Sequence, residues 1–214
     1  MKVGILGTGE VGRALGKGFI TLGHNVKLGA REASNEKALA FAREHGARAS
    51  SGTFADAAAY GDLIVLATLG SANEEALRAA GLDHFSGKVL IDTTNPLDFS
   101  KGMPPRITGG LGDSGGELVQ SLLPDAKVVK AFNTVGNAHM FRPDFAGGPP
   151  DMFICGNDAE AKKEVSALLA DFGWGVADVG GIQSAHYLES MCLVWVLYAM
   201  QGGGWNHAFK LLKK

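Results

Sequence analysis

Three glycines near the start of the chain have the spacing that binds the phosphates of a dinucleotide. Gly7, Gly9 and Gly12 form a G-x-G-x-x-G turn between an apolar run typical of a buried strand and a helical segment. In that setting the first glycine makes the tight turn, the second lets a pyrophosphate approach the backbone, and the third lets the helix pack on the strand. The helix N-terminus also offers unpaired N–H groups to the phosphates. A glycine-rich turn of another α/β protein, such as a methyltransferase, is the alternative. The residues predicted to contact the dinucleotide here are Gly7, Thr8, Gly9, Glu10, Val11 and Gly12.

The end of the second expected strand indicates which dinucleotide binds. An NAD enzyme carries Asp or Glu there, but this chain has Ala30 followed by Arg31. Without the acid, a ribose 2′-phosphate meets no repulsion, and the guanidinium can pair with that phosphate. Glu32 is the competing feature, because an acid one residue later could reach a ribose. We therefore predict NADP(H), with further donors at the start of the next helix from Ser34, Asn35 and Lys37.

Alternating strands and helices are expected to position these residues. Continuous apolar runs such as 62–67 are typical of strands that are covered on both faces, and helical segments separate them. The pattern predicts an α/β fold with a doubly wound (Rossmann) parallel sheet of about eight strands. We assign residues 1–182 to this NADP-binding domain and residues 183–214 to a C-terminal helical extension. The extension consists of a long apolar helix over 183–200 and a short tail helix over 205–212.

Polar turns follow three of the expected strands at the edge of the sheet where ligands bind in such folds. They begin at residues 68, 93 and 132. Since the carboxyl ends of parallel strands meet at one edge, we expect these turns to contribute to a common site. The candidate contacts in or next to them are Ala67, Thr68, Leu69, Asn95, Pro96, Asn133, Thr134 and Asn137.

A serine-protease signature also occurs in the chain, but its context does not support it. Residues 112–116 read GDSGG, within a stretch over 98–116 that is rich in glycine and proline. That serine needs a histidine base and a buried aspartate on a β fold, whereas this chain alternates strands and helices. Ser114 is instead expected to cap the next helix, with Glu117 completing a capping box.

No residue pattern in the chain indicates a metal or a proton relay. The six histidines are scattered, with no H-x-x-x-H pair and no Cys/His cluster. Hydride transfer between two planar rings requires that the rings be oriented, while the cofactors supply the electronics. We therefore predict no catalytic side chain and no metal site.

The composition excludes several classes of protein. The chain has 214 residues, of which 46% are hydrophobic and 20% charged, as expected of a folded globular protein. A net charge of −2 gives no general attraction to nucleic acid or to an anionic membrane. The two cysteines form no C-x-x-C pair, and the longest apolar stretch is too short to cross a bilayer. We expect a cytoplasmic protein with neither nucleic-acid nor membrane partners.

The apolar helix over 183–200 carries large apolar residues nearly all round. Such a helix must be buried, either against the edge of its own sheet or against a second subunit. We predict a homodimer formed through this helix.

Five segments together resemble a known family. They are residues 7–12, 29–31, 94–97, 130–134 and 155–158. Their combination resembles the NADP oxidoreductases dependent on the deazaflavin coenzyme F-420 (F420). It is also similar to the NADPH domain of transmembrane ferric reductases. The resemblance implies NADP over the glycine turn, with its 2′-phosphate at Ala30 and Arg31. It implies a nicotinamide near Thr68, Asn95 and the turn over 133–137, and a flavin-like ring beneath residues 132–134.

The expected function is that of an NADPH-dependent oxidoreductase that passes hydride to F420 or a flavin-like small-molecule acceptor. One alternative is reduction of a small carbonyl, an imine or a ferric substrate. Carbonyl and imine reduction usually need a general acid, for which His139 and His186 are the candidates. The other alternative is a non-catalytic NADPH-binding sensor.

Overall fold

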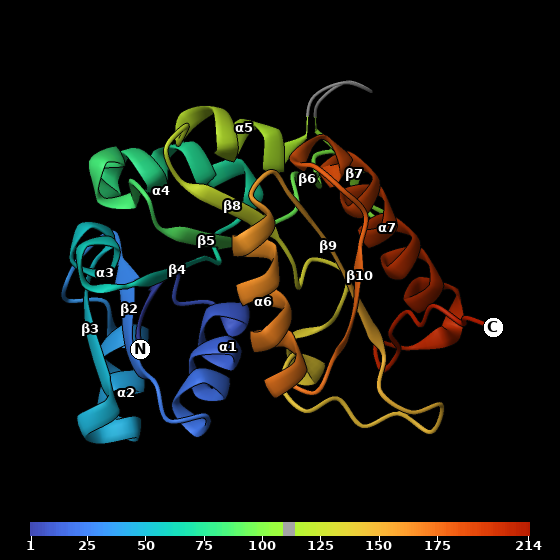
Figure 1. Cartoon of the computed structure of the whole chain (residues 1–214), viewed down its shortest axis with the longest axis horizontal. Helices are drawn as coiled ribbons and strands as arrows, with labels where there is room; N and C mark the ends of the chain where they lie inside the picture. Colours follow the sequence, from blue (N-terminus) through green and yellow to red (C-terminus); the bar gives the residue numbers. More distant parts are fainter. Residues whose placement is uncertain (109–113) are drawn as a thin grey trace.

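The computed structural model describes residues 1–108 and 114–214, and shows an eight-stranded sheet between two layers of helices (Figure 1). The order of the strands across the sheet is β10-β9-β8-β5-β4-β1-β2-β3. The strands of this sheet are β1 (Lys2–Leu6), β2 (Asn25–Ala30), β3 (Ala49–Thr53), β4 (Leu63–Leu66), β5 (Val89–Asp92), β8 (Lys127–Lys130), β9 (Asp151–Gly156) and β10 (Gly175–Asp178). A small antiparallel pair consists of β6 (Leu97–Asp98) and β7 (Arg106–Ile107).

Helices cover both faces of the large sheet, as Figure 1 shows. One face packs against α1 (Glu10–Thr21), α2 (Glu36–His45) and α6 (Ala159–Asp171). The other face packs against α3 (Phe54–Tyr60), α4 (Asn73–Ala80), α5 (Gly115–Leu122) and the first half of α7 (Ala185–Tyr198). Within the described residues, no helix combines the length and the apolar character that crossing a membrane requires.

Strand residues alternate between the two apolar layers. Leu63 and Val65 of β4 pack on the α1 side, whereas Ile64 and Leu66 pack on the α3 side, and all four are almost fully buried. This period of two is inherent in a strand, and a strand covered on both faces needs apolar residues at every position. The predicted α/β doubly wound fold is confirmed.

The sheet is not wholly parallel, which corrects the prediction. The end of β9 pairs antiparallel with the end of β8, Lys130 opposite Cys155, and β10 then lies parallel to β9. A parallel return normally uses a helix that crosses one face of the sheet. The connection over 131–150 contains only a single 3₁₀ turn at Asn137–His139, so the chain turns back at the same edge.

The predicted tail helix over 205–212 is wrong. The tail is extended, and its backbone pairs with other parts of the chain: Asp151 N–H donates to Phe209 O at 2.9 Å, and Leu211 N–H donates to the Asp151 carboxylate at 2.9 Å. The Trp195 indole N–H also donates to His207 O at 3.0 Å. Backbone groups that a helix would use internally therefore hold the tail against β9 and α7. The long helix is present, and a π-helical turn over Ala199–Gly203 follows it.

The predicted capping box of α5 is confirmed. Ser114 is buried, its Oγ accepts the Glu117 backbone N–H at 3.0 Å, and its hydroxyl donates to the Glu117 carboxylate at 2.9 Å. Glycine and aspartate at 112 and 113, the other part of the protease-like signature, lie outside the described residues. The hydroxyl of Ser114 thus serves the helix that it begins.

Replacing this cap should lower the stability of the fold. We expect Ser114→Ala to reduce the free energy of unfolding by about 1–2 kcal/mol, because an N-cap oxygen and its reciprocal bond are lost. Urea unfolding followed by circular dichroism measures the change. Ser121→Ala, in the last turn of the same helix, is the control and should change stability by less than about 0.5 kcal/mol. Equal effects of the two substitutions would contradict the capping role.

Candidate functional site

A cleft of about 680 Å³ lies at the carboxyl edge of the sheet. It opens where β1 and β4 are neighbours, the point at which the strand order reverses, and open α/β sheets bind ligands there. Four segments form its walls: the turn after β1, the end of β2, the loop after β4 together with the start of α4, and the turn after β5.

The glycines of the first turn differ in how closely they are packed. Gly7 has a φ of 130°, and a Cβ on it would clash with the carbonyl of Ala67. A Cβ on Gly12 would clash with the carbonyl of Gly7. A Cβ on Gly9 would meet no atom within 4 Å. Two glycines are therefore required by the fold, whereas the space beside Gly9 is open, as it is at the second glycine of a phosphate-binding turn.

The N-terminus of α1 faces this open space. Gly9 is its N-cap residue and supplies no side-chain oxygen, so the first-turn N–H groups have no side-chain cap. The Glu10 carboxylate pairs with the Arg13 guanidinium, which partly neutralises the one acid of that turn. An uncapped helix start of this kind suits a pyrophosphate.

The end of β2 presents Arg31 to the cleft. Its Nε lies 3.2 Å from the carboxylate of Glu75 on α4, on the opposite wall, and about two-thirds of each side chain is exposed, 68% and 67%. Asn35 also lines the cleft, but its Oδ1 accepts the Ala38 N–H at 3.1 Å and caps α2. Arg31 and Lys37 are the two cations predicted to bind the 2′-phosphate end of the dinucleotide, and of these two Arg31 lines the cleft.

The turn after β5 is held by a pair of amides. Asn133 Nδ2 donates to Asn95 Oδ1 at 3.0 Å, and Asn95 Nδ2 donates to Asn133 O at 2.9 Å. Among the described residues, the buried Oδ1 of Asn133 has no hydrogen-bond partner. The pair ties the turn after β8 to the turn after β5, and only Asn95 of the two lines the cleft.

The structure brings most of the predicted contacts together around the cleft. Those that line it are Gly7, Thr8, Gly9, Glu10, Val11, Ala30, Arg31, Asn35, Ala67, Thr68, Leu69 and Asn95. The others lie outside its lining, either packed behind the turns or exposed at the start of α2: Gly12, Ser34, Lys37, Pro96, Asn133, Thr134 and Asn137.

Sequence reasoning missed the wall formed by α4 and the rim after β5. The missed lining residues are Gly29, Phe54, Gly70, Ser71, Ala72, Glu75, Ala76, Thr93, Thr94, Leu97 and Phe99. Two large apolar side chains at this rim face solvent, Leu69 with 76% and Phe99 with 53% of its surface exposed. The polar turn at residue 68 could have indicated that the residues after it, up to the start of α4, also line the cleft. No local sequence pattern indicates that Phe99 does so.

A fully buried lysine lies behind the cleft, and no local sequence pattern indicates its burial. Lys130 Nζ contacts the carboxylates of Asp92 at 2.8 Å and Glu189 at 2.9 Å, and all three side chains are inaccessible to solvent. Burial alone would lower the pKa of Lys130, but the two carboxylates outweigh it and hold the pKa above its ordinary value. The lysine is therefore charged.

The two cysteines lie in the same region but are not nucleophiles. Burial raises the pKa of the Cys155 thiol to about 12 and that of the Cys192 thiol to about 11. Both thiols stay protonated at neutral pH, and the thiolate is the reactive form.

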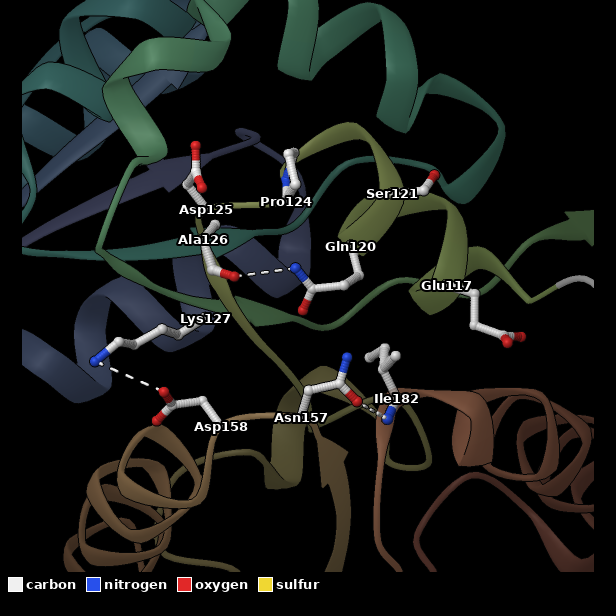
Figure 2. Close-up of a pocket in the computed structure, with 10 residues that line it drawn as sticks. All are labelled: Glu117, Gln120, Ser121, Pro124, Asp125, Ala126, Lys127, Asn157, Asp158 and Ile182. Carbon is white, nitrogen blue, oxygen red and sulfur yellow. Dashed lines mark hydrogen bonds and ion pairs between the residues drawn. The ribbon is translucent and has the colours of Figure 1, made fainter.

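A second concave region, of about 650 Å³, lies near the amino end of β8 (Figure 2). Its polar groups hold its own walls together. Gln120 donates to Ala126 O at 3.0 Å, Asn157 Oδ1 accepts the Ile182 N–H at 2.9 Å, and Lys127 lies 3.8 Å from Asp158. Over residues 1–108 and 114–214, no cluster of three His, Cys, Asp or Glu side chains could hold a metal.

Comparison with known proteins points to one family. The family described as NADP oxidoreductase, coenzyme F420-dependent, matches residues 2–96. The F420-dependent NADP reductase of Methanocaldococcus jannaschii is 30% identical over 203 residues, which cover 89% of this chain and 89% of that protein. Metalloreductase STEAP3 of Rattus norvegicus is 30% identical over 192 residues, 90% of this chain but only 36% of the metalloreductase.

Solved structures agree with these matches. A protein from Arthrobacter sp. FB24, provisionally assigned as an F420-dependent NADP reductase, superposes over the full length of both chains with a TM-score of 0.93 and 40% identity. A reductive aminase from Aspergillus terreus in complex with NADPH has a TM-score of 0.67 and 23% identity, covering 94% of this chain and 62% of the aminase. At that identity the aminase shares the fold only.

Gly9 offers a test of the phosphate site that leaves the fold intact. We expect Gly9→Ala to raise the Kd for NADPH roughly tenfold or more, because a methyl group would occupy the space that a pyrophosphate needs. Its free energy of unfolding should change by less than about 1 kcal/mol. Titration of NADPH fluorescence and urea unfolding measure the two quantities.

Gly12→Ala is the matched control, because it adds the same methyl group to the same turn at a position that is closely packed. Its Cβ meets the backbone of the turn, so it should lower the free energy of unfolding by about 1–3 kcal/mol. Unchanged NADPH binding in Gly9→Ala would show that the cofactor does not lie over this turn.

Proposed function

The chain belongs to the family of F420-dependent NADP oxidoreductases, and on that basis we propose that it passes hydride between NADP(H) and F420 in the cleft. One observation carries the proposal. The same cleft has an open glycine turn at the start of α1 and an exposed apolar rim at Leu69 and Phe99. The first suits phosphates, and the second suits the face of a planar ring system.

The phosphate-binding half rests on charge and space. The uncapped start of α1 and the space beside Gly9 would hold the pyrophosphate. Arg31 would hold the 2′-phosphate, because Ala30 puts no acid at the preceding position. When bound, NADPH supplies the hydride, and this chain binds and orients it.

The acceptor half rests on the lack of an acid near the rim among residues 1–108 and 114–214. The titratable side chains that line the cleft are Glu10, Arg31 and Glu75, all on the α1, β2 and α4 walls. His139 bonds to Asn206, and His186 bonds to Gln183 O, so neither lines the cleft. Carbonyl or imine reduction needs a proton donor beside the acceptor, whereas ring-to-ring hydride transfer does not. Two electrons and one proton move as hydride, and water supplies the second proton of the reduced deazaflavin.

The choice of acceptor and of cofactor is tested by NADPH oxidation. We expect turnover with F420, and slow or no turnover with FMN, FAD or ferric chelates. NADH should give a kcat/KM about 10- to 100-fold lower than NADPH, since a charge-assisted hydrogen bond to the 2′-phosphate is worth about 1.5–3 kcal/mol. Equal rates with the two donors would contradict the role of Arg31, and oxidation with FMN or iron but not F420 would contradict the deazaflavin.

Arg31→Gln should remove the preference for NADPH. Arg78→Gln is the matched control, because Arg78 also pairs with an α4 glutamate, Glu74, but lies outside the cleft lining.

We further propose that the protein is a homodimer formed through α7. The first half of this helix packs in the core, but four large apolar side chains on it face solvent: Tyr187 at 64%, Val194 at 54%, Leu197 at 41% and Tyr198 at 57% exposed. Exposed apolar residues gathered on one helix favour a protein partner, and a second copy presents the same surface.

Introducing charge on this surface should separate the subunits. We expect sedimentation equilibrium to give a dimer for the wild-type protein and a monomer for Val194→Asp, because an unpaired carboxylate in an apolar interface is costly. Ala40→Asp, on the exposed side of α2, should stay dimeric. A monomeric wild type at micromolar concentration would refute the dimer.

A further inference from the structure

Two adjacent residues of α7, Leu188 and Glu189, are connected to the cleft by the buried side chains of Asn133 and Lys130. The Glu189 carboxylate lies 2.9 Å from Lys130 Nζ, which also donates to the carbonyl of Thr94 at 2.8 Å. The carbonyl of Leu188 accepts from Asn133 Nδ2 at 2.9 Å, and the same nitrogen donates to Asn95 Oδ1. Thr94 and Asn95 both line the cleft. The C-terminal helix therefore holds the turn after β5 from behind, at two consecutive positions.

The connection continues along the wall of the cleft. Lys130 Nζ donates to Asp92 Oδ2 at 2.8 Å, and the hydroxyl of Thr94 donates to Asp92 Oδ1 at 2.7 Å. Asn73 Nδ2 donates to that hydroxyl at 2.7 Å, and Thr68 Oγ1 donates to Asn73 Oδ1 at 2.7 Å. An unbroken series of hydrogen bonds thus joins Glu189 on α7 to Thr68 in the loop after β4.

The carboxylate of Asp92, paired with Lys130, sets the direction of the bonds that run from Thr94 to Thr68. An ionised Asp92 can only accept, so the Thr94 hydroxyl must donate its single hydrogen to it. Thr94 Oγ1 then accepts from the Asn73 amide nitrogen, which leaves the Asn73 oxygen facing Thr68. Thr68 in turn must donate to that oxygen. Its remaining capacity toward the cleft is therefore that of an acceptor.

Asp92 is paired with Lys130, and the second carboxylate, that of Glu189, has further partners of its own. Glu189 accepts the backbone N–H groups of Gly115 at 3.1 Å and Gly116 at 3.0 Å, at the start of α5. The positive end of that helix offsets the extra negative charge of the three side chains. Each of the three buried side chains therefore has partners within hydrogen-bond distance.

We propose that Lys130 and Glu189 are positioning residues for the reaction, which hold the Thr94–Asn95 turn and present Thr68 to the ligand as a hydrogen-bond acceptor. The inference rests on the proposed function, because it assumes that the nicotinamide half of NADP(H) lies against this wall. A carboxamide N–H₂ group is the kind of donor that such an acceptor would bind.

The test compares the binding of whole NADPH with that of 2′,5′-ADP, which lacks the nicotinamide half. Glu189→Gln keeps the size of the side chain but removes its charge. It should raise the Kd for NADPH about 3- to 10-fold, the loss expected for one misplaced hydrogen bond, and leave the Kd for 2′,5′-ADP within about twofold. Calorimetric titration of each ligand needs no electron acceptor.

Glu117→Gln is the matched control. Glu117 also holds the start of α5, through Ser114, but does not contact Lys130. It should leave both Kd values within about twofold even if it lowers stability. Equal effects of the two glutamine substitutions on NADPH binding would overturn the positioning role in favour of a structural one.

Thr68 tests the far end of the series without disturbing the buried charges. Thr68→Val should raise the Kd for NADPH by the same 3- to 10-fold factor, roughly one hydrogen bond, and Thr68→Ser, which keeps the hydroxyl, should restore it. If Glu189→Gln does not fold, the two Thr68 variants still test whether Thr68 binds the nicotinamide half of NADPH. Equal NADPH affinity in the two Thr68 variants would overturn the inference, whereas a wild-type protein that binds 2′,5′-ADP but not NADPH would refute the nicotinamide placement itself. A wild type that binds neither ligand would refute the proposed function and the inference with it.

Discussion

The buried contact of Lys130 with Asp92 and Glu189 is the interaction on which the rest of the structure depends. Removing three charges from water is costly, and the fold tolerates it only because each charge has a partner. Removing one partner from such a group typically costs about 3–5 kcal/mol, since a charge is then left buried alone. The three residues come from β5, β8 and α7, and Glu189 also binds the start of α5. The geometry of the C-terminal helix is thus coupled to the centre of the sheet.

The site follows from the order of the strands. Because the order reverses between β1 and β4, the helices that follow these two strands cover opposite faces and leave a crevice between them. The close packing of Gly7 and Gly12 brings the backbone of the first turn up to that crevice, and Gly9 keeps it open. The same short turn therefore closes the core below it and leaves room for phosphate above it.

Local patterns in the sequence correctly predicted the structural features that are determined by residues close together in the chain. The apolar run over 62–67, the glycine turn over 7–12 and the Ser114–Glu117 cap all appear in the structure, because each is decided within a few residues. Features that depend on distant pairing were missed. The antiparallel direction of β9 and the extended tail are decided by contacts with β8, α7 and Asp151. Nothing near Lys130 in the sequence indicates that its two carboxylates lie 38 residues before it and 59 residues after it (130 − 92 and 189 − 130).

The ion pair of Arg31 with Glu75 has a consequence for how a ligand enters. The pair joins the two walls at the mouth of the cleft, and its exposure makes it weak and easily screened by salt. In the proposed complex, a 2′-phosphate that binds Arg31 would replace the Glu75 carboxylate at the guanidinium. Release of Glu75 would remove one weak contact between α4 and the end of β2, so that the two walls could adjust their separation to the molecule between them at little cost.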